Sequence, residues 1–201
     1  VGGVLAGIRL REAGIPFIIV EKNSDVGGTW HENTYPGARV DTPNYFYCYS
    51  FEPNHDWSQY YSQQPELQAY LRRCCDEYGV GGHLQLNTTV SDVVFAEDEQ
   101  VWRVHVRRQD GATEILEARA VISAVGQLNQ PKIPDFPGRK SFKGPQFHSA
   151  RYEHQHELRG KRVAVIGSGA SAFQLVPAIA EQVAQIKVFQ RSPVWMFPNA
   201  Q

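Results

Sequence analysis

The stretch VAVIGSGASA, residues 163–172, decides the fold class, because a run of apolar residues leads directly into a glycine-rich turn. Gly167, Gly169 and Ala172 occupy the three positions of the G-x-G-x-x-G/A fingerprint between a predicted strand and a predicted helix. In that fingerprint the glycines permit a tight turn and let backbone amides approach a pyrophosphate at the helix N-terminus. A glycine turn without a ligand is the alternative. We expect the turn to bind a dinucleotide through Gly167, Ser168, Gly169, Ala170, Ser171 and Ala172.

The segments on either side of this turn predict a parallel βαβ unit. KRVAVIG (161–167) is typical of a strand, GASAFQLVPAIAEQVA (169–184) of a helix and QIKVFQR (185–191) of a second strand. NAD-binding folds usually carry an acid at the end of that second strand, where it accepts a hydrogen bond from the ribose 2′-hydroxyl. This chain has Arg191 and Ser192 there, and Arg191 suits a 2′-phosphate. The sequence therefore predicts NADPH rather than NADH, with a solvated surface arginine as the alternative.

The N-terminal segment predicts a second nucleotide-binding unit. A helix is expected over 3–13, ended by Gly14, and PFIIVEK (16–22) is typical of a buried parallel strand that ends in the acid Glu21. Gly3 lies 18 residues before Glu21, close to the spacing of about 20 between a fingerprint and its ribose-binding acid. The first two fingerprint glycines would then precede the chain. One dinucleotide held by an acid and another held by an arginine imply hydride transfer, typically from NADPH to a flavin.

The middle of the chain carries irregular and antiparallel segments. Residues 23–64 lack a period and are rich in Gly, Pro, Asn and aromatic residues, so they predict a long loop of the kind that is usually functional. Residues 65–78 predict an amphipathic helix. Alternating segments between 84 and 124, with an Asp110-Gly111 turn, predict a small antiparallel meander that returns to the main sheet. The Pro- and Gly-rich residues 126–144 predict a connector.

These elements together predict an α/β fold class with two Rossmann-like dinucleotide-binding domains, one for FAD and one for NADP, and a small antiparallel β meander. The chain is expected to be truncated at both ends. We expect residues 1–126 to form the FAD-binding domain without its first strand and first fingerprint glycines. Residues 127–160 are expected to form a linker, and residues 161–201 the start of the NADP-binding domain.

The composition excludes several classes of protein. Of 201 residues, 42% are hydrophobic, which is enough for a sizeable core. The 20 basic and 21 acidic side chains give a net charge of -1, which argues against nucleic acid as a partner. No apolar run approaches the roughly 20 residues that cross a bilayer. We therefore expect a globular, cytoplasmic protein with no membrane partner.

The cysteines and histidines predict no metal site. Cys48, Cys74 and Cys75 are odd in number and show neither metal-ligand nor redox-motif spacing, so we expect reduced, structural thiols. His154 and His156 form a His-x-His pair, but no further ligand spacing completes a site.

The stretch DVGGTWHENTYPGARVDTPNYFYCYSF, residues 25–51, resembles the flavin-contacting segment of class B flavoprotein monooxygenases, particularly the Baeyer-Villiger monooxygenases. Residues 123–126 (SAVG) are similar to the A-x-G turn with which that family covers its flavin. With both fingerprints, the resemblance covers essentially the whole chain. The chain resembles 4-hydroxyacetophenone and cyclohexanone monooxygenases, and its nearest branch is that of aryl-ketone enzymes such as 4-hydroxyacetophenone monooxygenase. The residues that carry it in the loop are Gly27, Gly28, Trp30, Asn33, Tyr35, Pro36, Gly37 and Asp41.

The resemblance implies FAD and NADPH as cofactors. It implies one catalytic role, in which Asp41 orients an active-site arginine that lies beyond this chain. Trp30 and Tyr47 could instead be core aromatic residues. The residues implied to bind FAD are Gly3, Glu21, Gly27, Gly28, Thr29, Trp30, Asp41, Tyr47 and Gly126.

A linker signature of the family, F-x-G-x-x-x-H-x-x-x-W-[P/D], is matched in part. Phe142, Gly144 and His148 fit it, whereas Tyr152 and Glu153 replace its last two residues. The resemblance implies that His148 couples NADP binding to domain movement and does not transfer a proton. A tyrosine at this position is similar to the sister flavin-containing monooxygenases, which oxidise nitrogen and sulfur.

The resemblance implies that the complete enzyme inserts one oxygen atom from O2 into a ketone through a C4a-peroxyflavin and forms an ester or lactone. The alternatives are an N- or S-oxygenating monooxygenase that acts on amines or sulfides, and a non-catalytic dinucleotide-binding fragment. A disulfide reductase is nearly excluded, because no redox cysteine pair lies near the flavin fingerprint. Without the first strand and glycines, the 201-residue chain alone is expected to be inactive and not to retain FAD.

Overall fold

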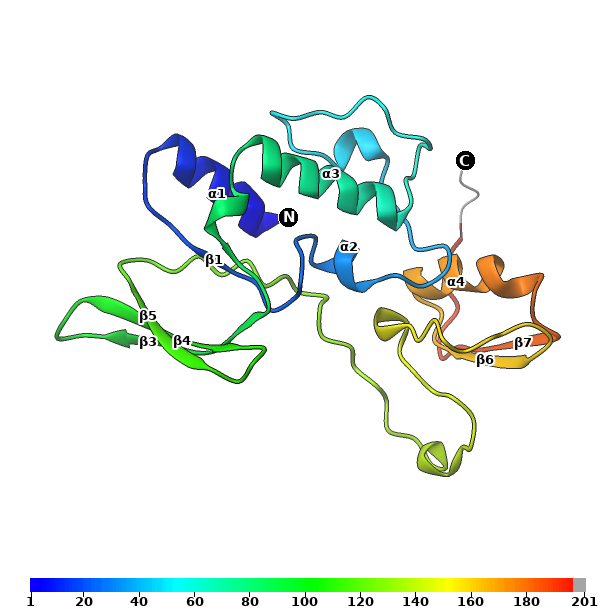
Figure 1. Cartoon of the computed structure of the whole chain (residues 1–201). Coiled ribbons are helices and arrows are strands. Elements are labelled where there is room, and N and C mark those ends of the chain that lie inside the picture. Colours follow the sequence, from blue (N-terminus) through cyan, green and yellow to red (C-terminus); the bar gives the residue numbers. More distant parts are fainter. Residues whose placement is uncertain (197–201) are drawn as a thin grey trace. The chain divides into compact units, whose positions relative to one another are not determined.

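The chain forms two compact units, described by a computed structural model over residues 1–196 (Figure 1). One unit, unit 1, comprises Val1–His31 and Gln68–Gln127, and the other, unit 2, comprises Glu32–Leu67 and the residues from Leu128 onward. The break after residue 127 lies within one residue of the predicted boundary, whereas residues 32–67 of the predicted segment 1–126 group with unit 2. The last five residues of the predicted segment 161–201 lie outside the described part of the chain. The nucleotide roles of the three predicted segments stay predictions.

Unit 1 begins with the predicted helix, α1 (Gly2–Glu12). The helix ends where the sequence predicts, because Gly14 adopts a φ of 66°. The amides of Gly14 and Ile15 donate to the carbonyls of Arg11 and Leu10 at 3.1 and 2.9 Å. These two bonds form a Schellman motif, which satisfies carbonyls that the helix end leaves without partners.

The parallel strand that follows α1 is confirmed but shorter than predicted. β1 (Ile19–Val20) pairs in parallel with β2 (Leu84–Gln85), and Ile19 lies opposite Leu84. The prediction of a strand over 16–22 with a buried interior was wrong in its length and burial, because only these two residues have ladder partners among the described residues and both are half-buried.

The predicted helix over 65–78 is α3 (Gln64–Glu77), which is displaced by one residue. Its apolar face is buried, since Leu67, Leu71 and Cys74 are between 0% and 4% exposed. α3 leads through a short 3-10 helix, Gly81–His83, into β2. The spacing of apolar residues therefore predicted correctly which side of the helix forms the core.

The meander is a three-stranded antiparallel sheet of β3 (Thr88–Ala96), β4 (Val101–Arg108) and β5 (Thr113–Ala118), in that order. The Asp110-Gly111 turn is confirmed, because Gly111 has a φ of 89° and the Ala112 amide donates to Asp110 Oδ1 at 2.9 Å. The expected return to the main sheet is not observed, since residues 121–124 form no strand in the described structure. A strand requires a ladder partner, and alternation alone does not supply one.

Unit 2 contains the predicted βαβ unit: β6 (Arg162–Ile166), α4 (Ala170–Ala180) and β7 (Gln185–Phe189). β6 and β7 pair in parallel. The helix ends four residues before the predicted residue 184, because the Ala184 amide instead donates to the Lys161 carbonyl at 2.9 Å. No helix among residues 1–196 has the length and apolar character that a membrane crossing needs.

The long stretch over 23–64 is irregular, as predicted, apart from short elements that the sequence did not indicate. These are the four-residue helix α2 (Thr29–Glu32), a 3-10 helix at Asn44–Phe46, and isolated antiparallel pairings of Arg39 with Gln63 and of Tyr49 with Glu52. The predicted linker, 127–160, carries only two 3-10 turns among its described residues, at Arg139–Ser141 and Ser149–Arg151.

Candidate functional site

The glycine turn between β6 and α4 has the conformation that a nucleotide-binding turn requires. Gly167 has a φ of 113°, which other residues rarely adopt, and its amide donates to the Phe189 carbonyl at 2.9 Å. Gly169 caps α4, and its carbonyl accepts bonds from the Ala172 and Phe173 amides at 2.9 and 3.2 Å. A methyl group placed on Gly167 or Gly169 would meet no atom within 4 Å. The turn therefore faces open space that a ligand can approach closely.

The electrostatics of this turn suit an anion. The first turn of α4 contains no acidic residue, and a helix N-terminus carries a partial positive charge. Ile166 lies opposite Phe189 in the β6–β7 ladder, so Gly167 and Arg191 follow neighbouring strands at the same edge. Arg191 and Ser192 are both exposed there. The structure thus brings the predicted fingerprint and the predicted phosphate-binding arginine to one end of a two-stranded parallel sheet.

In unit 1, Glu21 follows β1 at the carboxyl end of the parallel pair. Its amide donates to the Gln85 carbonyl at 3.0 Å, and its carbonyl accepts a bond from the Thr88 amide at 2.9 Å. One carboxylate oxygen accepts a bond from the Asn23 amide at 2.9 Å. These bonds hold the acid at the end of the strand, which is the place predicted for a ribose-binding carboxylate.

Gly7, which the sequence did not single out, sets the close packing of α1. A methyl group on Gly7 would lie 2.8 Å from Ile19 Cδ1 and 3.0 Å from Val80 Cγ1, whereas one on the predicted Gly3 would lie no closer than 3.7 Å to its nearest neighbour, Ala124. Glycine costs a helix interior roughly 1 kcal/mol relative to alanine. A glycine in the middle of a predicted helix was therefore the signal that another element approaches the helix closely at Gly7.

The loop that carries the flavin-family residues begins with two glycines in conformations unfavourable to other residues. Gly27 and Gly28 have φ values of 127° and 56°. Their carbonyls accept bonds from the Trp30 and His31 amides at 3.2 and 3.0 Å, which start α2 at Thr29. Trp30 is only 8% exposed. Burial of this ring is compatible both with the predicted role beside a flavin and with the alternative role as a core residue, and both stay predictions.

α3 holds this glycine loop in unit 1. The Gln68 amide donates to His31 Nδ1 at 3.0 Å and to the Val26 carbonyl at 3.5 Å. One helical turn later, Arg72 forms an ion pair with Asp25, whose other oxygen accepts a bond from the Val26 amide at 2.7 Å. The sequence did not identify Gln68 or Arg72, because nothing local links them to a loop some forty residues earlier in the chain.

The second half of the loop packs on α4 in unit 2. The Tyr35 hydroxyl donates to Gln174 Oε1 at 2.8 Å, and burial raises the pKa of Tyr35, with a smaller contribution from the negative charge of Asp41. A methyl group on Gly37 would lie 2.5 Å from the Gln174 carbonyl oxygen and 2.9 Å from Ala178 Cβ. Asp41 itself is exposed. Gln174 is a further residue of the candidate site that the sequence did not reveal.

A buried polar pair holds the chain just after Asp41. Asn44 and Ser62 are both 0% exposed. Asn44 Nδ2 donates to the Gln59 carbonyl at 2.7 Å and to the Ser62 hydroxyl, and Asn44 Oδ1 accepts a bond from the Ser62 backbone amide at 3.0 Å. Tyr47, predicted to line the flavin, is half-buried three residues later.

The linker residues lie in unit 2. His148 Nδ1 accepts a bond from the Ala150 amide at 3.1 Å and caps the turn at Ser149–Arg151, which leaves the ring proton on Nε2. Burial raises the pKa of Tyr152, whose ring contacts those of Phe147 and His154. The ring of Phe142 is 60% exposed and folds over Gly144, where a methyl group would lie 2.8 Å from it.

The remaining predictions concern Gly126, the three cysteines and potential metal ligands. Gly126 has a φ of 74° and no atom within 4 Å of an added methyl group. The three thiols are free, and burial raises the pKa of Cys75 to about 11, so this thiol stays protonated at neutral pH. No group of three or more potential metal ligands occurs within residues 1–196.

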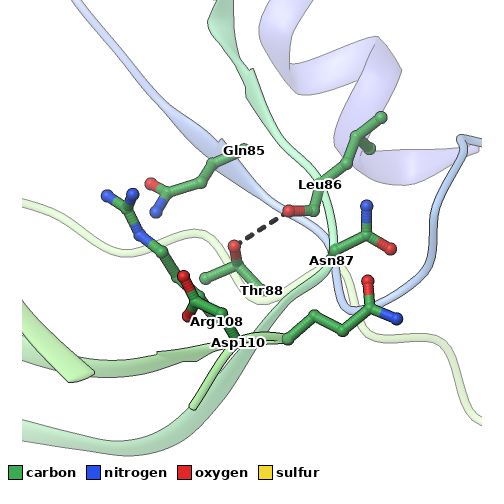
Figure 2. Close-up of a pocket in the computed structure, with 7 residues that line it drawn as sticks. Gln85, Leu86, Asn87, Thr88, Arg108 and Asp110 are labelled. Carbon is green, nitrogen blue, oxygen red and sulfur yellow. Dashed lines mark hydrogen bonds between the residues drawn. The ribbon is translucent and has the colours of Figure 1, made fainter. Parts of the chain in front are cut away.

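An open pocket of about 540 Å³ lies in unit 1, where β2 leads into β3 (Figure 2). The Thr88 hydroxyl donates to the Leu86 carbonyl at 2.9 Å, and the Asn87 amide donates to the Asn23 carbonyl at 2.9 Å. None of the predicted site residues lines this pocket, which lies instead beside the segment that follows Glu21. Its lining residues are Gln85, Leu86, Asn87, Thr88, Arg108, Gln109 and Asp110.

Known proteins are similar to this chain in both sequence and fold. A Baeyer-Villiger monooxygenase of Streptomyces coelicolor is 41% identical over 199 residues, which cover 98% of this chain and 37% of that protein. The structure of OTEMO in complex with FAD and NADP is 36% identical, with a TM-score of 0.88 over 98% of this chain and 38% of the other. Cyclohexanone monooxygenase from Rhodococcus sp. Phi1 bound to NADP+ is 35% identical, with a TM-score of 0.89 and coverage of 98% and 37%.

These similarities confirm the α/β fold and the predicted resemblance, and the chain spans less than two fifths of the length of these proteins. A place in the aryl-ketone branch stays a prediction. The family described as FMO-like, Flavin-binding monooxygenase-like, matches residues 3–200. The chain therefore belongs to the flavin-binding monooxygenase-like family.

Proposed function

We propose that the full-length protein is an FAD- and NADPH-dependent monooxygenase that inserts one oxygen atom from O2 into a ketone. The reaction consumes the ketone, O2, NADPH and a proton, and it yields an ester or lactone, NADP+ and water. The observation that carries this proposal is the contrast between two strand ends, since β1 is followed by Glu21 and β7 by Arg191. The acid suits the free ribose of FAD, and the arginine suits the 2′-phosphate of NADPH.

The turn from Gly167 to Ala172 would hold the NADPH pyrophosphate. The open space at Gly167 and Gly169 fits a ligand that approaches the backbone, and the α4 N-terminus favours its negative charge. Arg191 and Ser192 would bind the 2′-phosphate, because both are exposed at the end of β7 next to this turn. Residues 161–201 would accordingly begin the NADP-binding domain.

Residues 1–126 would bind FAD. Glu21 fits the adenosine ribose, because the bonds to Gln85, Thr88 and Asn23 hold it at the strand end. The backbone at Gly28 and Gly126 is open to a ligand, since a methyl group at either would meet no atom within 4 Å. Bound FAD would supply oxygen activation, and bound NADPH the hydride. Trp30 and Tyr47 would exclude water from the flavin, with Gly3, Gly27 and Thr29 completing the set.

Two further residues would act on position and movement. Asp41 is exposed at the end of the segment that packs on α4, so its carboxylate is available to orient a cation. His148 caps its own turn through Nδ1, which fits a conformational role for the linker 127–160 better than proton transfer. Phe142 and Gly144 would shape the same linker.

The competing function is oxygenation of amines or sulfides. Tyr152 favours it, because a tyrosine stands where the Baeyer-Villiger signature has tryptophan. The longer match of residues 25–51 to the Baeyer-Villiger monooxygenases, which includes Asp41, favours a ketone as the substrate.

The test is to supply the full-length protein with NADPH, 18O2 and a mixture of 4-hydroxyacetophenone, cyclohexanone and methyl phenyl sulfide, and to identify the products by mass spectrometry. We expect an ester or lactone that carries one 18O atom. Sulfoxide as the sole oxygenated product would replace the proposal by its competitor. Loss of bound FAD during purification of the full-length protein would contradict both and support a non-catalytic dinucleotide-binding module.

A further inference from the structure

The side-chain amide of Gln174 binds both backbone polar groups of Arg39. Gln174 Oε1 accepts a bond from the Arg39 amide at 3.2 Å, and Gln174 Nε2 donates to the Arg39 carbonyl at 2.9 Å. Oε1 also accepts the Tyr35 hydroxyl at 2.8 Å. A carboxamide offers a donor and an acceptor in this arrangement at any ordinary pH. We call these three bonds the Gln174 clasp.

The clasp acts as the missing partner of a short extended segment. On one edge, the Ala38 carbonyl accepts a bond from the Gln64 amide at 2.8 Å, and the Val40 amide donates to the Ser62 carbonyl at 3.1 Å. The polar groups of Arg39, between them, point to the opposite edge, as alternation along a strand requires. Gln174 occupies that edge. The segment 38–40 is therefore paired on both sides, once by backbone and once by a side chain of α4.

Close packing adds to the clasp at its start. Gly37 has a φ of 81° and touches the α4 backbone at Gln174 so closely that a methyl group would overlap the carbonyl oxygen. Tyr35 is buried at 7% exposure. The loop thus rests directly on the helix that begins at the open glycine turn, and Gln174 lies five residues after Gly169.

Asp41 lies between two anchors. Before it, the segment 38–40 is held by the Gln174 clasp and by the 62–64 segment, and after it Asn44 is held by Ser62 and Gln59. An exposed carboxylate gains a defined position when the backbone on both sides is hydrogen-bonded.

We propose that Gln174 is a positioning residue that ties the nucleotide-binding helix α4 to the backbone that presents Asp41. The inference rests on the proposed function, in which Asp41 orients a cation at the reaction site. The helix that binds NADPH at its N-terminus thereby also sets the position of a carboxylate used for oxygen transfer. Without the clasp, reduction by NADPH continues, but the activated oxygen is released as hydrogen peroxide.

The test uses the full-length protein with FAD and the variant Gln174→Met, which keeps the length of the side chain but removes all three bonds. The matched control is Gln182→Met, because Gln182 lies just beyond the end of α4 and its amide makes a single bond of 3.4 Å to the Ala178 carbonyl. Tyr35→Phe removes one bond of the clasp and replaces Gln174→Met if that variant does not fold. The readouts are hydrogen-deuterium exchange of the peptide 36–41 and the ratio of hydrogen peroxide to ester formed per NADPH.

We expect Gln174→Met to raise exchange in 36–41 about tenfold at the Arg39 amide, the backbone amide that donates to the clasp. Losing that one hydrogen bond costs about one power of ten in an opening equilibrium. We expect the peroxide-to-ester ratio to rise as well, with Tyr35→Phe showing a smaller change in both and Gln182→Met in neither. Faster exchange with an unchanged ratio would overturn the positioning role, and unchanged exchange would overturn the clasp. A wild-type protein that oxygenates no ketone would overturn the proposed function. The exchange measurement would still test the clasp independently.

Discussion

Glycines lie at two places beside α4 in opposite surroundings. They are open at the N-terminal turn of the helix and crowded where the loop packs on its face. At the turn, Gly167 and Gly169 face open space. On the face, Gly37 touches the helix so closely that a single methyl group would overlap its backbone. Gly7 repeats the crowded case in unit 1, against Ile19 and Val80.

The difference separates two meanings of a glycine in a nucleotide-binding fold. Open glycines leave room for a ligand, so their replacement should affect binding. Crowded glycines leave room for the protein itself, so their replacement should affect stability. The first two fingerprint positions, Gly167 and Gly169, are of the open kind, because they follow the shape of the ligand.

The largest effect is expected at Gly37. Gly37→Ala adds strain from a φ of 81° to an overlap with the Gln174 carbonyl, and we expect a loss of about 2–5 kcal/mol in the free energy of unfolding. The measurement is urea denaturation of the full-length protein. Gly111→Ala is the matched control, because Gly111 has a φ of 89° but no atom within 4 Å. Equal losses in the two variants would mean that crowding adds nothing at Gly37.

The next largest effect is expected at Arg191, beside the open glycine turn of unit 2. Arg191→Ala should raise the Kd for NADPH about tenfold to a hundredfold and leave that for NADH nearly unchanged, because a charge-assisted bond to a phosphate contributes about 1.5–3 kcal/mol. Calorimetric titration of the full-length protein with both nucleotides measures this, with Arg159→Ala as the control for a lost surface charge. An equal change for NADPH and NADH would show that Arg191 does not read the 2′-phosphate.

A smaller loss is expected at Gly7. Gly7→Ala should destabilise the protein by about 1–2 kcal/mol, because overpacking against Ile19 and Val80 exceeds the gain of up to about 1 kcal/mol in helix propensity. Thermal unfolding of the full-length protein measures it. Gly2→Ala in the same helix meets its nearest atom at 3.7 Å and should be close to neutral. A stabilised Gly7→Ala variant would place this glycine with the open ones.

The smallest effect on stability is expected at Gly169. Its φ of -78° is ordinary and its surroundings are open, so Gly169→Ala should change the free energy of unfolding by less than about 0.5 kcal/mol. Its affinity for NADPH should nevertheless fall, as titration would show. Gly167→Ala, with a φ of 113°, should lose both stability and affinity. Unchanged NADPH binding in both variants would break the distinction between open and crowded glycines.

Local patterns predicted most of the elements. The apolar spacing identified α3 and its buried face, and the strand–turn–helix order identified β6, α4 and β7. The errors lie where a partner strand or a long-range bond decides an element's end. β1 is shorter than its apolar run, residues 121–124 form no strand, and α4 stops because Ala184 bonds to Lys161.

The candidate site divides in the same way. The nucleotide-binding roles of the fingerprint glycines, Glu21 and Arg191 stay predictions. Their places at a turn or a strand end were identified in advance, because a backbone that approaches a phosphate or ends a parallel strand needs particular residues at particular spacings. Gln68, Arg72 and Gln174 were not, because each holds a loop more than 35 residues away in the chain and leaves no local pattern.

Residue order alone therefore determines that this chain is α/β and carries a dinucleotide fingerprint, since periodicity and spacing are local properties of a chain. The resemblance to a flavin monooxygenase also comes from the sequence, through the residues of 25–51. The tertiary structure alone decides that Gly7 and Gly37 are crowded, that Gln174 pairs with Arg39, and that Asp41 lies between two anchored segments. These features depend on atoms brought within a few ångströms by folding, and no spacing in the sequence encodes that distance.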